Sequence, residues 1–351
     1  MNTDNLLKRS IENKELFWKE QAREIDWFEF PQTITSQDQH HYTQWFSDGK
    51  LNMCYLCIDK HIKDGFGDHI ALIYDSPVTQ QKKKYTFNEA REEISKLAGG
   101  LVSLGLKKGD TAVIYMPMIP QTLFAMLACA RIGVIHNVVF GGFAPHELVV
   151  RIDDCKPKAL ITATAGVEIV KRIPYLPLVE KAIELAQNKV ENIIVFNRKL
   201  VDNQHEMFEG LIDYEELVQK SEATECVAIE STHPLYLLYT SGTTGKPKGI
   251  TRDTGGYATA LKFSMKYIYG VEEGDTFWAA SDVGWVVGHS YIVYAPLINR
   301  NTTIIFEGKP VKTPDASTFW RIISENNVKV MFTAPTAIRA IKKEDPDGEL
   351  L

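Results

Sequence analysis

A segment rich in glycine, hydroxyl and lysine residues is the part of the sequence best suited to chemistry. Tyr239 to Gly249 reads YTSGTTGKPKG and follows the apolar run 235–238. Glycines let a backbone adopt positive φ and approach a ligand closely. Successive N–H groups in such a turn form an anion-binding concavity. Hydroxyls and lysines add donors and positive charge, so the segment predicts a loop that binds a polyphosphate.

The spacing within this loop differs from that of a Walker A loop. A Walker A loop has four residues between its glycines and a Ser or Thr after its lysine. Here two residues separate Gly242 from Gly245, and Pro247 follows Lys246. A P-loop kinase or GTPase is therefore disfavoured. The alternative interpretation is an exposed glycine-rich hairpin turn without a ligand, which the mixture of hydroxyls and lysines disfavours.

A second segment, SDVGWVVGHS at residues 281–290, has the composition of a small apolar pocket. Trp285 offers a large flat wall, the two valines that follow it are branched and apolar, and Gly284 and Gly288 allow close backbone approach. Together they suit a short apolar tail beside a carboxylate. The alternative is that Trp285 and the valines belong to the core. His289 is either a core histidine or a site residue.

These segments resemble a known family. YTSGTTGKPKGI is similar to the signature loop of the adenylate-forming superfamily, which includes acyl-CoA synthetases, luciferases and the adenylation domains of peptide synthetases. The segment 281–290 resembles the acyl-pocket segment of short-chain acyl-CoA synthetases, and VVFGGF at 138–143 resembles their CoA-binding segment. The similarity covers nearly the whole chain. It is closest to propionyl-CoA synthetases, with acetyl-CoA synthetases next, and DSPVT at 75–79 and FEGKPV at 306–311 look propionate-type.

The resemblance implies a role for each segment. The residues implied to hold the ATP phosphates are Thr240, Ser241, Gly242, Thr243, Thr244, Gly245, Lys246 and Lys248. Those implied to line the acyl pocket are Gly284, Trp285, Val286, Val287, Gly288 and His289. Those implied to bind CoA are Phe140, Gly141, Gly142 and Lys171. No metal ligand and no catalytic side chain is assigned.

The implied activity is an acid–thiol ligase reaction that releases AMP. A short-chain carboxylate attacks the α-phosphorus of MgATP to give an acyl-adenylate and pyrophosphate, and the CoA thiol then displaces AMP. No protein nucleophile is required, so catalysis rests on positioning and charge stabilisation. ATP, Mg²⁺ and CoA are the implied small-molecule cofactors and substrates. Acetyl-CoA synthesis, a non-catalytic nucleotide- or CoA-binding protein, and a domain that loads a carrier protein are the alternatives.

Two positions depart from the pattern of the acetate-type relatives. Their pair of arginines after the CoA segment is replaced here by Glu168 and Lys171. A carboxylate repels phosphate, so the grip on the CoA phosphates at Glu168 is in doubt. Val287 stands where those relatives usually carry a threonine. An apolar wall suits one more methylene, so we expect propionate to be preferred over acetate.

The order of apolar runs predicts the elements that position these segments. Thr86 and Glu89 form a capping box before a helix, and Pro120 opens an apolar helix that ends near Gly133. Asp213 and Glu216 suggest a second, weaker box. Strands are expected at 71–74, 111–116, 135–140, 159–163, 193–196, 235–239, 276–280, 303–306 and 328–333, and further helices at 145–154, 176–188 and 336–343. This alternation indicates parallel βαβ units and an α/β fold.

The resemblance places this α/β fold as the N-terminal domain of an adenylate-forming enzyme, with parallel sheets flanked by helices in two subdomains. We expect an aromatic-rich arm at 1–65, a first subdomain at 66–232 and a second, incomplete subdomain at 233–351 that carries the phosphate loop. The family's mobile C-terminal lid domain, with its catalytic lysine, is not found before Leu351. The 351-residue chain alone is therefore expected not to form acyl-CoA.

Composition excludes several other classes of protein. Hydrophobic residues make up 44% and charged residues 24% of the 351 residues, as in ordinary globular proteins. The net charge of −6 argues against non-specific nucleic-acid binding. No apolar run reaches the roughly 20 residues that span a bilayer. The N-terminus has neither the apolar core of a signal peptide nor the acid-poor composition of a transit peptide. We therefore expect a cytoplasmic protein without a membrane partner.

The five cysteines are too few and too scattered for a disulfide scaffold. Cys54 and Cys57 form a CxxC motif with His61 nearby. A zinc site needs a fourth ligand and usually a second pair. Two packed thiols are the favoured interpretation.

Overall fold

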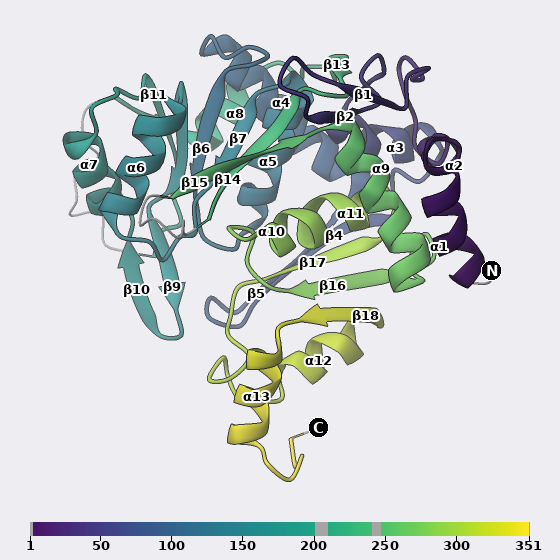
Figure 1. Cartoon of the computed structure of the whole chain (residues 1–351). Coiled ribbons are helices and arrows are strands. Elements are labelled where there is room, and N and C mark those ends of the chain that lie inside the picture. The colour runs from purple at the N-terminus through teal and green to yellow at the C-terminus, as the bar shows by residue number, and fades with distance from the viewer. Residues whose placement is uncertain (1–2, 201–209, 241–246, 351) are drawn as a thin grey trace.

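Two mixed β-sheets organise the computed structural model, which describes residues 3–200, 210–240 and 247–350 (Figure 1). The larger sheet has the strand order β12-β11-β8-β6-β7-β14-β15, and the smaller has the order β18-β16-β17-β4-β5. Neighbouring strands run parallel except in one edge hairpin of each sheet, β14–β15 and β4–β5. The strands of the larger sheet are β6 (Thr111–Tyr115), β7 (Ile135–Val138), β8 (Ala159–Ala163), β11 (Asn192–Phe196), β12 (Leu211–Asp213), β14 (Pro234–Thr240) and β15 (Lys248–Asp253). Those of the smaller sheet are β4 (Ile70–Ser76), β5 (Gln81–Thr86), β16 (Thr276–Ala280), β17 (Thr302–Phe306) and β18 (Val328–Thr333).

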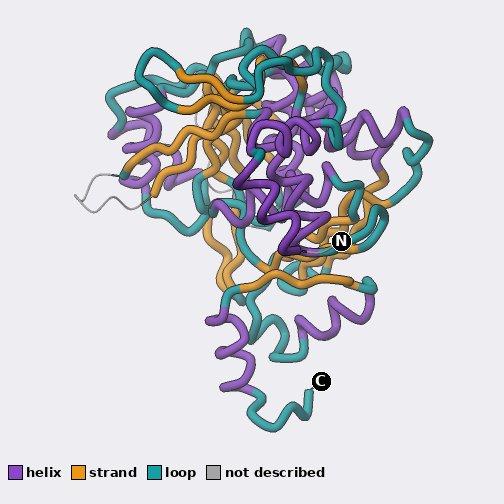
Figure 2. Tube along the Cα trace, turned by 45° about the vertical axis from the view of Figure 1, so that its right-hand side comes forward, coloured by secondary structure: helices purple, strands orange, loops and turns teal. Residues whose placement is uncertain are grey.

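Helices cover the faces of both sheets. Residues of α6 (Pro145–Cys155) and α7 (Leu176–Leu185) share a buried apolar cluster with one face of the larger sheet. The main core joins the opposite face to α4 (Phe87–Ser103), α5 (Pro120–Ile132) and the inner face of the smaller sheet. A third cluster packs α12 (Thr318–Glu325) and α13 (Pro335–Glu344) on the outer face of the smaller sheet. This end of the molecule projects from the main body in both views (Figures 1 and 2).

The remaining elements are short or lie at the periphery. The helices are α1 (Thr3–Glu12), α2 (Lys14–Ala22), α3 (Lys60–Lys63), α8 (Tyr214–Lys220), α9 (Gly255–Ser264), α10 (Val286–Gly288) and α11 (Ala295–Ile298). Three π-helical segments are η1 (Tyr55–Asp59), η2 (Met265–Tyr269) and η3 (His289–Tyr294). Small strands are β1 (Thr35–Gln37), β2 (Thr43–Trp45), β3 (Lys50–Leu51), β9 (Ala165–Glu168), β10 (Lys171–Pro174) and β13 (Ile229–Glu230). Within the described ranges, no helix has both the length and the apolar character needed to cross a membrane.

The α/β fold predicted from the apolar runs is confirmed, and so are its local signals. The Thr86 hydroxyl accepts from the Glu89 N–H while the Glu89 carboxylate accepts from the Thr86 N–H, which is a complete capping box. Gly133 ends α5 in the left-handed conformation, with φ of 72°. Asp213 caps α8 by accepting from the Glu216 N–H at 2.8 Å. Each expected strand overlaps an observed one, although β7 is shorter than expected because the chain turns away after Val138.

The hairpins are the elements that the alternation of strands and helices missed. β5 carries four consecutive exposed residues in QKKKYT, so it has no apolar run to mark it. The β9–β10 hairpin has strands of only four residues, AGVE and KRIP, too short for a periodic pattern, and it projects from the larger sheet (Figure 1). β15 is exposed over Lys248–Ile250. Strands at an edge need not bury a face, so hydrophobic periodicity does not predict them.

The two sheets exchange strands across the subdomain boundary expected at 232/233. β4 and β5 precede that boundary but lie in the smaller sheet with β16 and β17, whereas β14 and β15 follow it but complete the larger sheet. The reason is the pairing of β17 with β4 and of β14 with β7, both over long sequence separations. The division of the chain at that point stays a prediction, and the sheets themselves draw strands from both sides of it.

The N-terminal arm packs through its aromatic side chains, as its composition predicts. Phe17 and Trp18 contact Phe263 of α9, with ring centroids 5.8 and 5.5 Å away. Trp18 also contacts Trp45 edge to face at 5.8 Å. Offset and edge-on aromatic contacts of this kind contribute roughly 0.5–1.5 kcal/mol each beyond the buried area.

A buried ion pair joins this arm to the main core. Arg131 of α5 is fully buried, and its two terminal nitrogens donate to the two carboxylate oxygens of Asp59 in η1 at 2.7 and 2.9 Å. Arg91 of α4 adds a third bond at 3.0 Å. Burial would raise the pKa of Asp59, but the bonds and charges of Arg131 and Arg91 outweigh it and hold that pKa below its usual value. The Arg131 Nε also donates to the Thr224 carbonyl, so the pair fixes the segment after α8 as well.

We predict that Arg131→Met lowers the free energy of unfolding by about 3–5 kcal/mol, because it leaves a largely buried carboxylate without its main partner. Urea denaturation of the 351-residue chain measures the change. The control is Lys181→Met, which removes an exposed pair with Glu184 and should shift the result by less than about 1 kcal/mol. Equal, small shifts in both variants would show that the Asp59 pair does not hold the arm.

Candidate active site

The predicted phosphate loop connects two antiparallel strands. Residues 241–246 lie outside the described residues, but the loop's flanks are clear: Thr240 ends β14 and Lys248 begins β15, and these two residues are directly paired. Both are exposed. The loop therefore closes a hairpin, and because β14 runs parallel to β7 it leaves the sheet at the carboxyl edge of the parallel strands. Ligands of open α/β sheets bind at that edge.

The predicted CoA segment and acyl-pocket segment come together in space. Phe140 follows β7 of the larger sheet, and Trp285 follows β16 of the smaller sheet. Their ring centroids lie 5.9 Å apart, and Phe143 contacts Trp285 edge to face at 6.3 Å. These segments are more than a hundred residues apart in the chain, so the fold brings them into contact and not their proximity in the sequence. The two sheets meet at this point.

The glycines of both segments are required by close packing. A Cβ on Gly284 would lie 2.9 Å from the Cα of Phe140, and one on Gly288 would lie 2.0 Å from the carbonyl oxygen of Asp282. A Cβ on Gly141 would meet the Tyr175 hydroxyl at 2.3 Å. The predicted close backbone approach is therefore observed at Gly284 and Gly288. At both glycines the approach is between two parts of this chain, and at Gly284 it brings the acyl-pocket segment close to the CoA segment.

Trp285 and Val286 do not belong to the core. Their exposed fractions are 50% and 43%, and Val287 is half-buried. The core interpretation of these two side chains is therefore wrong. Gly142 is also exposed, beside the half-buried Phe140. Large apolar side chains held in the open at the meeting of two sheets are available to a ligand, although single exposed apolar residues are common on proteins.

His289 lies behind this surface, inside the core. It is fully buried, and its Nδ1 lies 3.1 Å from the Trp285 carbonyl oxygen. Its ring stacks parallel to that of His136 at 5.9 Å and lies 4.5 Å from Tyr236. Burial lowers the pKa of His289 to about 4, so the ring is neutral at physiological pH. Of the two interpretations that the sequence left open, the geometry favours the core histidine.

A cavity of about 200 Å³ adjoins the CoA segment. Gly141 and Gly142 form part of its wall, and the residues after β17 form another part. The β9–β10 hairpin contributes Glu168, whose carboxylate lies 3.5 Å from the Lys309 ammonium. Lys171 lies directly opposite Glu168 in the hairpin and is exposed. The acid that made the phosphate grip doubtful is thus partly neutralised by Lys309.

Asp282 is a site residue that the sequence interpretation missed. It lines the same cavity, and one carboxylate oxygen accepts from the Gly284 N–H at 2.7 Å. Burial raises the pKa of Asp282 to about 6, against the lowering effect of that hydrogen bond and of Lys309. A carboxyl group of raised pKa in a cleft marks a functional-site candidate. The sequence marks it only as an acid two residues after an apolar strand, which is too common a pattern to single it out.

A second missed feature is a buried ion pair between the sheets. Arg198, after β11, donates to both oxygens of Glu307, after β17, at 2.7 and 2.8 Å. Tyr74 and Ser76 of β4 donate to the same carboxylate at 2.6 and 2.9 Å. Both charged side chains are only 5% exposed. Glu307 lines the cavity, so this pair fixes one of its walls.

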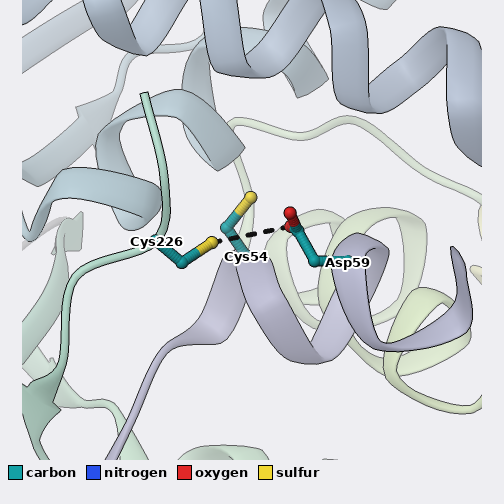
Figure 3. Close-up of side chains that lie close together, drawn as sticks. All are labelled: Cys54, Asp59 and Cys226. Carbon is teal, nitrogen blue, oxygen red and sulfur yellow. Dashed lines mark hydrogen bonds between the residues drawn. The ribbon is translucent and has the colours of Figure 1, made fainter. Parts of the chain in front are cut away.

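A group of sulfur and carboxylate atoms elsewhere has the spacing of metal ligands but is already paired. Cys54, Asp59 and Cys226 place their ligating atoms within 4.8 Å of one another (Figure 3). Arg131 occupies both oxygens of Asp59 and lies 3.4 Å from the Cys54 sulfur. A buried guanidinium opposes a cation at this place. Cys57 instead contacts the Tyr294 carbonyl at 3.8 Å, so the CxxC motif consists of packed thiols, as favoured.

Comparison with known proteins gives the class of this chain. The profile of the family described as AMP-binding enzyme matches residues 60–350, and that of the acetyl-coenzyme A synthetase N-terminus matches residues 3–57. The chain therefore belongs to the AMP-binding enzyme family, and the resemblance of its motifs to short-chain acyl-CoA synthetases is confirmed.

Several curated relatives of the chain are named as short-chain acyl-CoA synthetases or as a propionate–CoA ligase. The chain is 52% identical over 342 residues to acyl-CoA synthetase short-chain family member 3, mitochondrial, of Homo sapiens, a match that covers 97% of this chain and 50% of the relative. It is 42% identical to the propionate–CoA ligase of Salmonella typhimurium, covering 98% and 54%. An acetoacetyl-CoA synthetase structure from Streptomyces lividans shares the fold, with a TM-score of 0.87 at 23% identity over 96% of this chain and 51% of that one. The chain thus spans about half the length of its curated relatives.

We predict that the buried histidines make the fold sensitive to mild acid. Burial lowers the pKa of His289 and of His61 to about 4. Between pH 6.5 and 4 the unfolded chain therefore binds protons that the folded chain does not, and stability falls as pH falls. The expected loss is up to about 1.4 kcal/mol per pH unit for each histidine.

Urea denaturation at several pH values checks this dependence. His289→Gln should reduce the fall in stability with falling pH by the contribution of one histidine. The control is His146→Gln, which changes an exposed side chain and should leave the slope unchanged. If His289→Gln kept the wild-type dependence of stability on pH, the His289 ring would take up its proton in the folded state as readily as in the unfolded state.

Proposed function

We propose that this chain carries the substrate-binding part of an AMP-forming short-chain acyl-CoA ligase. The observation that carries the proposal is the contact of Phe140 with Gly284 and Trp285, which places the implied CoA and acyl segments side by side. The named activities of the human and Salmonella relatives support the same reaction class.

The proposed first step needs the α-phosphate of MgATP to meet a carboxylate. The flanks of the glycine-rich loop, Thr240 and Lys248, are paired and exposed at the carboxyl edge of the larger sheet. Backbone N–H groups and the lysine charge would hold the phosphates and stabilise the pyrophosphate as it leaves. Mg²⁺ would arrive with ATP and neutralise part of the phosphate charge, and we assign none of the described side chains to it.

The proposed second step brings the CoA thiol to the acyl-adenylate. Its sulfur attacks the acyl carbon, the thioester bond forms and AMP leaves with the electrons of the broken C–O bond. Phe140 and Gly142 would border the incoming thiol arm, beside the cavity that Gly141 and Glu307 help to line. Lys309 lines this cavity and Lys171 lies opposite Glu168 in the neighbouring hairpin, and both would offer positive charge to the phosphates of CoA, partly offset by Glu168.

We infer propionate as the preferred acid. The acyl side of the site presents Trp285 and Val286, whose exposed fractions are 50% and 43%, and the half-buried Val287. A wholly apolar wall leaves no hydroxyl unpaired against the one methylene by which propionate exceeds acetate. Burying one methylene contributes about 0.8 kcal/mol, so acetate should still be used.

Ligand binding to the 351-residue chain tests the nucleotide part of the proposal. Titration calorimetry should detect MgATP, and Lys248→Ala should weaken it roughly threefold to tenfold, the scale of one exposed charge-assisted contact. Binding of propionate should be unaffected by this change. The control is Lys220→Ala on α8, an equally exposed lysine away from the loop. Equal weakening by both variants would remove Lys248 from the phosphate site.

Substrate preference tests the acyl part. In a chain that carries these residues at the full length of the relatives, kcat/KM should favour propionate over acetate by roughly 4- to 200-fold, from the burial of one methylene to the upper end for apolar pockets. Val287→Thr should shift that ratio toward acetate, whereas Val170→Thr, a matched change at an exposed valine of the hairpin turn, should not. Severalfold better use of acetate by the wild type would make acetate the substrate.

A further inference from the structure

One arginine lies between the two halves of the candidate site. Arg151 belongs to α6, and its guanidinium carbon is 5.3 Å from the ring centroid of Tyr239 and 5.2 Å from that of Phe143. Tyr239 precedes the glycine-rich loop by two residues, and Phe143 ends the segment that resembles a CoA site. The arginine is only 5% exposed. A planar cation can attract two aromatic faces at once, one on each side.

The same helix holds Tyr239 by a second contact. The Tyr239 hydroxyl donates a hydrogen bond to the Asp154 carboxylate, one turn along α6 from Arg151. Burial and this carboxylate raise the pKa of Tyr239, so the hydroxyl keeps its proton. Tyr239, near the end of β14, is therefore held to α6 by two contacts: its ring lies against Arg151, and its hydroxyl bonds to Asp154.

Phe143 connects Arg151 to the acyl-pocket segment. Its ring meets Phe140 at 5.4 Å and Trp285 at 6.3 Å, in both cases edge to face. Its carbonyl oxygen accepts from the Tyr115 hydroxyl at 2.9 Å, which fixes its backbone to β6. A continuous row of contacts thus runs from the base of the phosphate loop, through Arg151, to Trp285.

The charge of Arg151 is balanced within its own helix. Its Nη1 donates to the Glu147 carbonyl at 2.6 Å and to the Glu147 carboxylate at 2.8 Å. That carboxylate is partly exposed, with 41% of its side chain accessible. If the Glu147 carboxylate were neutralised, the Glu147 backbone carbonyl would still accept from the Arg151 Nη1. This separates the charge-balancing role of Glu147 from the contacts with the rings.

We propose that Arg151 is a positioning residue that holds the base of the glycine-rich loop and the 140–143 segment in one fixed relation, so that loss of its guanidinium loosens both together. It is not proposed to touch a substrate. The inference rests on the proposed function only for the identity of the two ligands. Its structural content concerns Tyr239 and Phe143 and can be measured without any ligand.

Amide hydrogen exchange of the ligand-free 351-residue chain is the first measurement. Arg151→Met keeps an unbranched apolar stem but removes the charge and the planar face of the guanidinium. Exchange should rise roughly threefold to tenfold in peptides covering 237–240 and in those covering 139–143, the scale of one or two lost cation–π contacts. Arg151→Lys should give a smaller rise, because an ammonium keeps the charge but not the planar face.

Glu147→Gln is the matched control. It removes the helix ion pair and leaves the guanidinium between the two rings, so exchange in both peptides should stay at the wild-type level. Peptides of the smaller sheet, such as β17, report general loosening and should be unchanged in every variant. A rise in only one of the two segments, or an equal rise over the whole chain, would overturn the proposal.

Titration with MgATP and with CoA separates this inference from the proposed function. If the wild-type chain binds both, Arg151→Met should weaken each by a similar factor, while Glu147→Gln weakens neither. If the wild-type chain binds neither ligand, the proposed function of this part of the protein fails, and the exchange measurement still decides the role of Arg151. Weakening of one ligand alone would contradict a shared positioning role.

Discussion

The buried bonds between Arg198 and Glu307 set the relation of the two sheets. Each residue follows a strand of a different sheet, and the carboxylate also accepts from two hydroxyls of β4. Removing one partner of a buried ion pair leaves the other charge buried without a counter-charge or water. The sheets therefore cannot slide past each other at this point without losing the two hydrogen bonds from Arg198, while the two hydroxyls of β4 hold the carboxylate in place within its own sheet. The cavity beside Glu307 and the contact of Phe140 with Trp285 both depend on that fixed relation.

The chain builds this arrangement by crossing between sheets. β4 and β5 come early in the sequence, and β4 pairs with β17, which lies more than two hundred residues later. The larger sheet is completed only by β14 and β15. Each sheet then contributes one segment to the site from the carboxyl end of its strands, 140–142 from one and 282–288 from the other. Neither sheet could form this site alone, since each supplies a single wall.

Local sequence signals were enough to predict most of the fold, and the glycines were enough to predict part of the site. Thr86 with Glu89, and Gly133, encode helix ends within a few residues of sequence, and the structure shows both. Gly284 was predicted to allow close approach, and it lies against Phe140. Asp282, Arg198 and Glu307 were not predicted. Their importance comes from partners distant in sequence, and an isolated acid or arginine has no periodicity or spacing that marks it.

The cysteines make the opening of this fold visible to a simple chemical reagent. Cys54, Cys57 and Cys129 are buried and Cys155 and Cys226 are half-buried, in the arm, α5, the end of α6 and the segment after α8. Burial raises the pKa of Cys129 to about 12 and that of Cys155 to about 11, and the thiolate is the reactive form. Alkylation in the native state should therefore be slow and limited by local opening. The order in which the five sulfurs become labelled would give a map, without any engineered probe, of which part of the molecule comes apart first.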